Sequence, residues 1–296
     1  MKKIKYIVIT TIALIAILQS CTEKDVPDTD RTVVVVDDTT TNDFDLFLDR
    51  EFVEPYNIDF IYKWIDVESN FDYTLVPAEY EESVRMANLV RYLCLEAFEE
   101  VAPDDFLKTY FPKQIVMVGT SAFQNNGTEI LGTAEGGVKI VLYDINSLDT
   151  TDIDLLYSRY FRTIFHEFAH ILHQTKDFTV DFDAISLDDY VGDLWNESWN
   201  QTDNTSAAAG FISDYASSEP NEDFVELFAF YITNNETSWA QIIENAGDVG
   251  GPIITQKMEI VKKYLLSTWS IDIDALRDEI ELRANNLDSQ DLDNIN

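Results

Sequence analysis

The chain is short of cysteine, histidine and positive charge. Its 296 residues include two cysteines, three histidines and 20 lysines and arginines, against 55 aspartates and glutamates, for a formal net charge of -35. One cysteine, Cys21, has a separate role described below, so no intramolecular disulfide is expected and the fold must rest on packing, or on packing and a metal. So acidic a chain repels phosphate groups, which argues against nucleic acid as a partner and against membrane binding through a polybasic patch.

The chain does have enough apolar material for a large core. Hydrophobic residues make up 46% of it and aromatic residues 12%, which excludes a disordered acidic chain. No repeat of fixed period occurs. We therefore expect one folded domain over residues 43–296, of the size usual for a catalytic domain.

The first 20 residues are typical of a secretory signal. Three lysines precede an apolar run, Tyr6 to Leu18, that is too short to span a bilayer as a stable helix. The next residues, Leu-Gln-Ser-Cys ending at Cys21, resemble the bacterial lipobox, in which the peptide is cut before the cysteine and the cysteine carries the lipid. The resemblance implies a lipoprotein that works outside the cytoplasm. An ordinary signal peptide followed by a chance cysteine is the alternative.

Residues 21–42 are rich in Thr, Asp and Val and lack helical periodicity, so we expect a tether between the lipid and the folded domain. The acidic residues directly after Cys21 resemble the surface-export signals of some Gram-negative lipoproteins. That resemblance implies an outer-membrane lipoprotein that faces the cell exterior and contacts the membrane by its lipid anchor only.

The hydrophobic pattern of the rest predicts an α+β fold that is mainly helical, with a small mixed or antiparallel sheet. Residues 175–218, rich in Asn and Asp, are expected to be loops and short helices. Cys94 stands between Leu93 and Leu95 and is expected to be a buried, unreactive thiol. The expected strands are 57–64, 114–119 and 138–143, and the expected helices are 78–101, 152–174, 222–234, 257–269 and 273–285.

All three histidines lie in one octapeptide, His166-Glu-Phe-Ala-His170-Ile-Leu-His173. Residues four apart share a helix face, about 6 Å apart along the axis, so His166 and His170 can reach one ion. Glu167 can then act on a water bound to that ion. This is the H-E-x-x-H pattern of zinc hydrolases, in which the metal lowers the pKa of its water and the carboxylate takes the proton. A helix face with histidines directed to solvent is the alternative.

A catalytic zinc takes three protein ligands and one open position. Lys176 stands where the metzincin pattern has its third histidine, which excludes that class. His173 is one candidate for the third ligand because it shares the face of the other two histidines. It lies a further turn away, however, and a straight helix cannot easily bring all three onto one ion. Glu222 and Glu226 also share a face, on the apolar helix 222–234, and two buried carboxylates are costly unless a cation or histidines take up the charge. Asp223 is expected to be a first-turn acid that favours the helix dipole.

These residues carry a resemblance to known enzymes. His-Glu-Phe-Ala-His, followed about fifty residues later by Glu222-Asp-Phe-Val-Glu226-Leu-Phe, resembles the zincin-type gluzincin metallopeptidases, in particular the lethal-factor-type toxin protease. The resemblance implies Zn2+ as cofactor, Glu222 as the third ligand, and Glu226 behind a histidine. It also implies that Tyr215, seven residues before Glu222, assists the reaction. His173 is then a residue that supports a ligand.

Several features also resemble the zinc metallopeptidase lipoproteins encoded beside starch-utilisation-type outer-membrane importers. They are the lipid anchor, Pro55-Tyr-Asn-Ile58, the His-x-x-His end of the zinc helix, and Leu276-Arg277. This resemblance implies a cell-surface zinc peptidase associated with nutrient import, with a peptide or glycopeptide substrate and an importer complex as partner. We expect strand 138–143 to be the edge strand on which an extended peptide is laid.

Two other functions remain open. An accessory lipoprotein could capture peptides, glycopeptides or glycans for the importer, with Trp195 and Trp199 stacking on sugars and a non-catalytic or glycopeptide-specific zinc site. The intact Glu167 argues against a dead site. A purely structural zinc is disfavoured because such sites usually close with four protein ligands, often cysteines, and no cysteine is near.

Overall fold

The computed structural model describes residues 41–65, 73–123, 129–130, 132–135, 138–200, 202 and 204–295. The predicted signal peptide, Cys21 and nearly all of the predicted tether lie outside the described residues. Residues 42–296 form one compact unit. None of the helices in the described part combines the length and the apolar composition that crossing a membrane requires.

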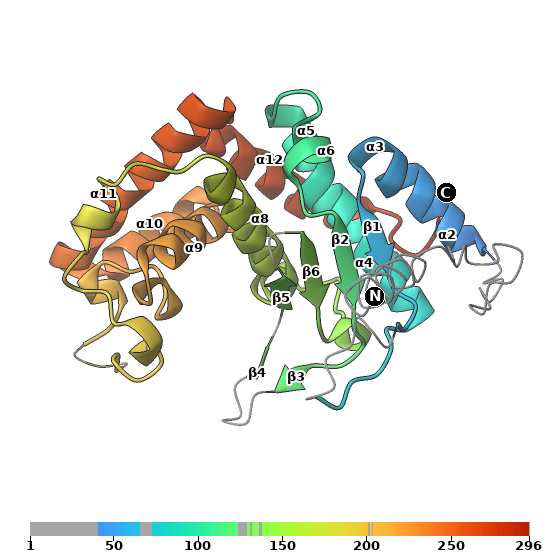
Figure 1. Ribbon diagram of the computed structural model, residues 1–296, viewed down its shortest axis with the longest axis horizontal. Coiled ribbons are helices and arrows are strands. Elements are labelled where there is room, and N and C mark those ends of the chain that lie inside the picture. The colour runs from blue at the N-terminus through green and yellow to red at the C-terminus, as the bar shows by residue number, and fades with distance from the viewer. Residues whose placement is uncertain are drawn as a thin grey trace, which may run out of the picture. The chain divides into compact units, whose positions relative to one another are not determined.

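The main sheet has four strands, in the order β1 (Asp59–Ile61), β2 (Gln114–Met117), β6 (Lys139–Leu142) and β5 (Gly132–Glu135). The first three run parallel and β5 is antiparallel to β6, so the sheet is mixed (Figure 1). The run Ile140-Val141-Leu142 is fully apolar, as expected of a strand covered on both faces. A second, two-stranded sheet pairs β3 (Ala122–Phe123) with β4 (Glu129–Ile130).

The prediction that strand 138–143 is an edge strand is wrong. Strand β6, within the predicted 138–143, lies between β2 and β5, so its backbone groups are used on both sides. On this side the sheet ends at β5, which the sequence pattern did not predict, and the opposite edge is β1. Gly132 of β5 approaches the following helix so closely that a Cβ there would lie 2.4 Å from Cγ2 of Thr163. A glycine is therefore needed where the edge strand passes this helix.

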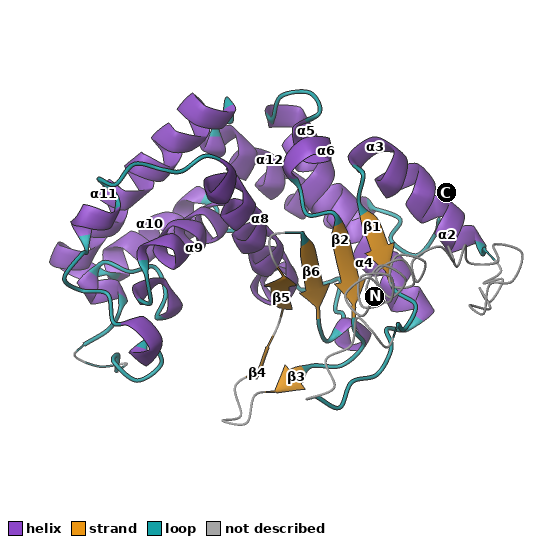
Figure 2. Cartoon of the chain, in the orientation of Figure 1, coloured by secondary structure: helices purple, strands orange, loops and turns teal. Residues whose placement is uncertain are grey.

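Helices make up most of the unit (Figure 2), which confirms the mainly helical α+β fold. Short π-helical segments join some of them into continuous helices, such as residues 80–101 and 153–175. The α-helices are α2 (Asp43–Leu48), α3 (Glu54–Tyr56), α4 (Tyr80–Leu89), α5 (Glu96–Val101), α6 (Phe106–Tyr110), α7 (Ile153–Leu156), α8 (Arg162–Thr175), α9 (Pro220–Ile232), α10 (Glu236–Asn245), α11 (Gly247–Tyr264) and α12 (Ile273–Asn285).

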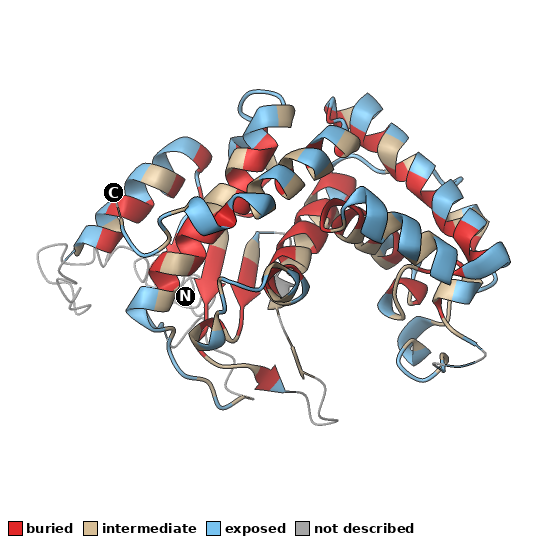
Figure 3. Ribbon diagram, turned by 180° about the vertical axis from the view of Figure 1, so that it is seen from behind, coloured by how far each residue is buried: buried red, intermediate tan, exposed pale blue. Residues whose placement is uncertain are grey.

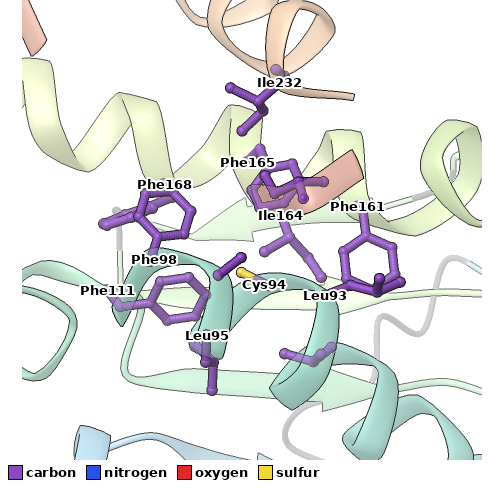
Figure 4. Packing of buried hydrophobic residues seen from close by; sticks show 14 of the residues in the cluster. Leu93, Cys94, Leu95, Phe98, Phe111, Phe161, Ile164, Phe165, Phe168 and Ile232 are labelled. Carbon is purple, nitrogen blue, oxygen red and sulfur yellow. The ribbon is translucent and has the colours of Figure 1, made fainter. Parts of the chain in front are cut away.

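The apolar side of α8 holds this helix in the centre of the core. Ile164, Phe165, Phe168 and Leu172 are buried there at helical spacing, and Phe98 of α5 packs 5.3 Å from Phe168, ring to ring. Figure 4 shows the α8 side chains above those of the segment Leu93–Phe98, with Cys94 among them. Cys94 is fully buried and its burial raises its thiol pKa. The buried faces of the helices meet in this region (Figure 3).

Candidate metal centre

Helices α8 and α9 pack side by side and bring three ligand atoms together (Figure 1). Nε2 of His166 lies 3.1 Å from Oε2 of Glu222, and Nε2 of His170 lies 3.3 Å from the same oxygen. The two Nε2 atoms are 3.2 Å apart. The histidines come from one face of α8 and Glu222 from the first turn of α9. Pro220 stands at the start of that helix, where its fixed φ suits the first turn.

The chemistry of these three atoms fits a bound cation. Nδ1 of His166 lies 2.7 Å from Oε1 of Glu226, so in a neutral ring Nδ1 carries the hydrogen and Nε2 presents a lone pair. Oε2 of Glu222 is buried and accepts no hydrogen bond from the described residues. Burial opposes charge on His166, yet Glu222 and Glu226 raise its pKa to about 10. The cluster therefore favours a positive charge at its centre.

The Nδ1 atoms of His166 and His170, on the far side of each ring from Glu222, contact further polar residues. Ser213 donates to Oε2 of Glu226 at 2.6 Å, which fixes the carboxylate that faces His166. Nδ1 of His170 lies 2.9 Å from Nε2 of His173. Burial and the neighbouring His170 lower the pKa of His173 to about 4, so it is a neutral acceptor. His173 thus faces the far nitrogen of His170, and such supports orient ligands and raise their basicity.

The metal-facing side of α8 opens into a cavity of about 360 Å³. Glu167 lies on its wall, and burial is the main cause that raises the pKa of this carboxyl, with Glu222 and Glu226 adding to it. A raised pKa makes Glu167 a better proton acceptor. The lining residues are Gly132, Ser158, Arg162, Thr163, His166, Glu167, Tyr215, Glu226 and Phe230.

Tyr215 reaches the same cavity from the loop before α9. Its ring stacks on His166 with 6.0 Å between centroids, and Trp195 packs edge-on against it with 5.2 Å between centroids. Burial and the nearby Glu222 raise the pKa of Tyr215, so its hydroxyl stays protonated. Trp199 is used differently, because its Nε1 donates to Ser217 at 2.8 Å and its ring packs on Phe211. Of the two tryptophans, Trp195 is the one beside the site.

Asp223 occupies the first turn of α9, as expected, but it also forms an ion pair that the sequence did not reveal. Its carboxylate and the Lys257 ammonium of α11 are 2.6 Å apart and both side chains are fully buried. Burial raises the pKa of Asp223 to about 6 against the pull of Lys257. Tyr190 donates to Asp223 at 2.9 Å, and Lys257 donates to the Gly210 carbonyl at 2.9 Å. This network locks α9 against α11 directly beside Glu222.

Replacing Lys257 with methionine should destabilise the fold by about 3–5 kcal/mol, because Asp223 is left as a buried, unpaired carboxylate. The matched control is Lys262→Met on the same helix, whose partner Asp274 is partly exposed and which should cost no more than about 1 kcal/mol. Urea unfolding of zinc-loaded protein measures both. Equal losses in the free energy of unfolding would show that the buried pair stabilises the fold no more than the partly exposed pair does.

The chain belongs to the family described as "Putative zinc-binding metallo-peptidase", whose model matches residues 37–274, which confirms the predicted family. A crystal structure of a "putative zinc-binding metallo-peptidase" from Bacteroides caccae is similar, with 41% identity, a TM-score of 0.76, and coverage of 86% of this chain and 96% of that one. A comparison with curated proteins finds no match.

The cofactor Zn2+ is confirmed at the level of the family, and the group His166, His170 and Glu222 can hold a metal ion. Sequence reasoning missed Ser213 and Arg162. Ser213 is one serine in a long polar loop, and no local pattern marks it. Arg162 stands four residues before His166, so the helical spacing alone could have placed it on the metal-facing side.

Proposed function

We propose that the protein is a zinc-dependent peptidase that hydrolyses peptide bonds in the cavity beside His166. One observation carries the proposal: a His-His-Glu cluster that favours a cation adjoins an open cavity on whose wall the Glu167 carboxylate lies. A bound zinc would supply a Lewis acid that polarises a carbonyl and lowers the pKa of water. His166, His170 and Glu222 would hold it.

The residues of the chain divide the remaining work. Glu167 accepts the proton of the attacking water and returns it to the leaving amine, for which its raised pKa is suited. The protonated Tyr215 hydroxyl donates a hydrogen bond to the substrate carbonyl oxygen as negative charge develops there. Glu226 and His173 hold the two imidazoles in place.

An extended substrate is expected to lie along β5. This strand is the edge of the sheet that contacts α8, and it includes Gly132 of the cavity wall. A peptide can pair with the free edge of a strand through main-chain hydrogen bonds, whatever its sequence. The substrate would then cross the cavity in a defined register relative to Glu167.

For the cell, we propose a lipoprotein anchored through Cys21 to the outer membrane, facing the exterior and serving an importer. The support is the sequence of residues 1–42. Capture of glycopeptides without cleavage is the second candidate, favoured by Trp195 beside Tyr215.

The test uses the chain from Thr22 onward. We expect about one zinc per chain, cleavage of a mixed peptide library followed by mass spectrometry, loss of cleavage on chelation, and recovery when zinc is returned. Zinc without cleavage would support the capture function. A protein that binds no zinc would overturn both candidates.

A further inference from the structure

Arg162 is the first residue of α8 and lies one helical turn before His166. Its Nε donates to Oγ1 of Thr233 at 3.2 Å, and its guanidinium carbon lies 4.2 Å from the centre of the Phe230 ring. Phe230 lies in the last turn of α9, and Thr233 directly follows that helix. These contacts hold the planar group in one orientation at the wall of the cavity and leave its two terminal nitrogens for another partner.

The other arginines of the described part of the chain are paired with carboxylates. Arg159, three residues earlier, contacts both Glu129 and Asp144 at 2.6 and 2.7 Å. Arg162 has no carboxylate within 4.0 Å among the described residues, and its terminal nitrogens donate to none of them. The paired arginines are Arg50, Arg85, Arg91, Arg159, Arg277 and Arg283.

An unpaired guanidinium is unusual in so acidic a chain. Burial lowers the pKa of Arg162, although the charges of Glu226 and Asp154 oppose that shift. Its guanidinium is therefore partly removed from water without a carboxylate of the described residues in contact, which is costly unless an anion binds it directly. Among the residues that line the described cavity, Arg162 is the only lysine or arginine, beside the acidic Glu167 and Glu226. Its free fork matches the two oxygens of a carboxylate.

We propose that Arg162 binds a carboxylate of the substrate next to the scissile bond, and so sets the substrate class. The inference rests on the proposed peptidase function. Arg162 and His166 are four residues apart on one helix, about 6 Å along its axis. That separation suits a carboxylate of the residue adjoining the cleaved bond, either the C-terminal carboxylate or an Asp or Glu side chain.

The experiment measures binding and needs no turnover. Zinc-loaded Glu167→Gln protein is titrated in a calorimeter with acetyl-tetra-alanine as free acid and as amide, and with an amide-capped tetrapeptide containing Asp or Asn. We expect one acid to bind about tenfold more tightly than its neutral partner, as a charge-assisted bond implies. Adding Arg162→Gln should reduce that ratio to about one, and Arg162→Lys should retain part of it.

Arg159→Gln is the matched control, because it removes an equal charge from the same continuous helix at an arginine that is already paired with Glu129 and Asp144. It should leave the ratio of acid to neutral peptide affinity unchanged. A preference for the free C-terminal acid indicates an exopeptidase, and a preference for Asp an endopeptidase selective for acidic residues. Acid binding that survives Arg162→Gln, or no acid binding at all, overturns the proposal. Cleavage of the library by protein with Glu167 intact decides the peptidase function separately.

Discussion

Replacing Glu167 with glutamine should leave zinc bound while peptide hydrolysis falls by at least 10²–10⁴-fold, the range that a positioned general base contributes. The substitution keeps the shape of the side chain and removes only its ability to accept a proton. Glu167 is not part of the ligand group formed by His166, His170 and Glu222, so the metal content should not change. The measurement is kcat on the best library peptide, with zinc per chain determined on the same sample.

The environment of Glu167 explains why the loss should be large. Its carboxyl is mostly removed from water in the cavity wall, and burial raises its pKa. No other described carboxylate that lines this cavity is free for the same task, because Glu226 accepts from Ser213 and faces His166. A Glu167→Gln protein that turns over as fast as the unchanged protein would remove Glu167 from the mechanism.

Replacing Glu222 with alanine should lower zinc affinity by more than the 10–100-fold that is typical when a residue behind a ligand is lost. Oε2 of Glu222 lies within 3.3 Å of both histidine Nε2 atoms, so its loss leaves two ligands where a catalytic zinc takes three. Competition with a chromogenic chelator gives the dissociation constant.

Two controls separate ligation from support and from folding. Glu226→Gln should weaken zinc binding only 10–100-fold, because Glu226 reaches the metal site through His166. Glu219→Ala removes an exposed acid at the start of the same helix and should change nothing. If Glu222→Ala retains zinc as tightly as Glu219→Ala, the third ligand must be another residue.

The helices that carry the site were predictable because their signals are local. Helix 152–174 was predicted and residues 153–175 are helical, since apolar side chains recur at helical spacing. The pairing of His166 with His170 follows from that helix alone. Helix α10 was missed, and it has no buried residue to produce such a pattern. The start of α11 was missed because Gly250 and Gly251 suggest a turn, whereas a Cβ at Gly250 would lie 1.9 Å from the Ala207 carbonyl oxygen.

By itself, the sequence determined the helices that carry the site, the fold class and the two histidines with their base, because each depends on residues within one or two turns. Only the tertiary structure decided the strand order, the edge position of β5, the support of Glu226 by Ser213, and the lack, within the described part of the chain, of a carboxylate beside Arg162. These depend on contacts between segments distant in the chain. Such contacts are set by how side chains pack in three dimensions, and no local periodicity records them.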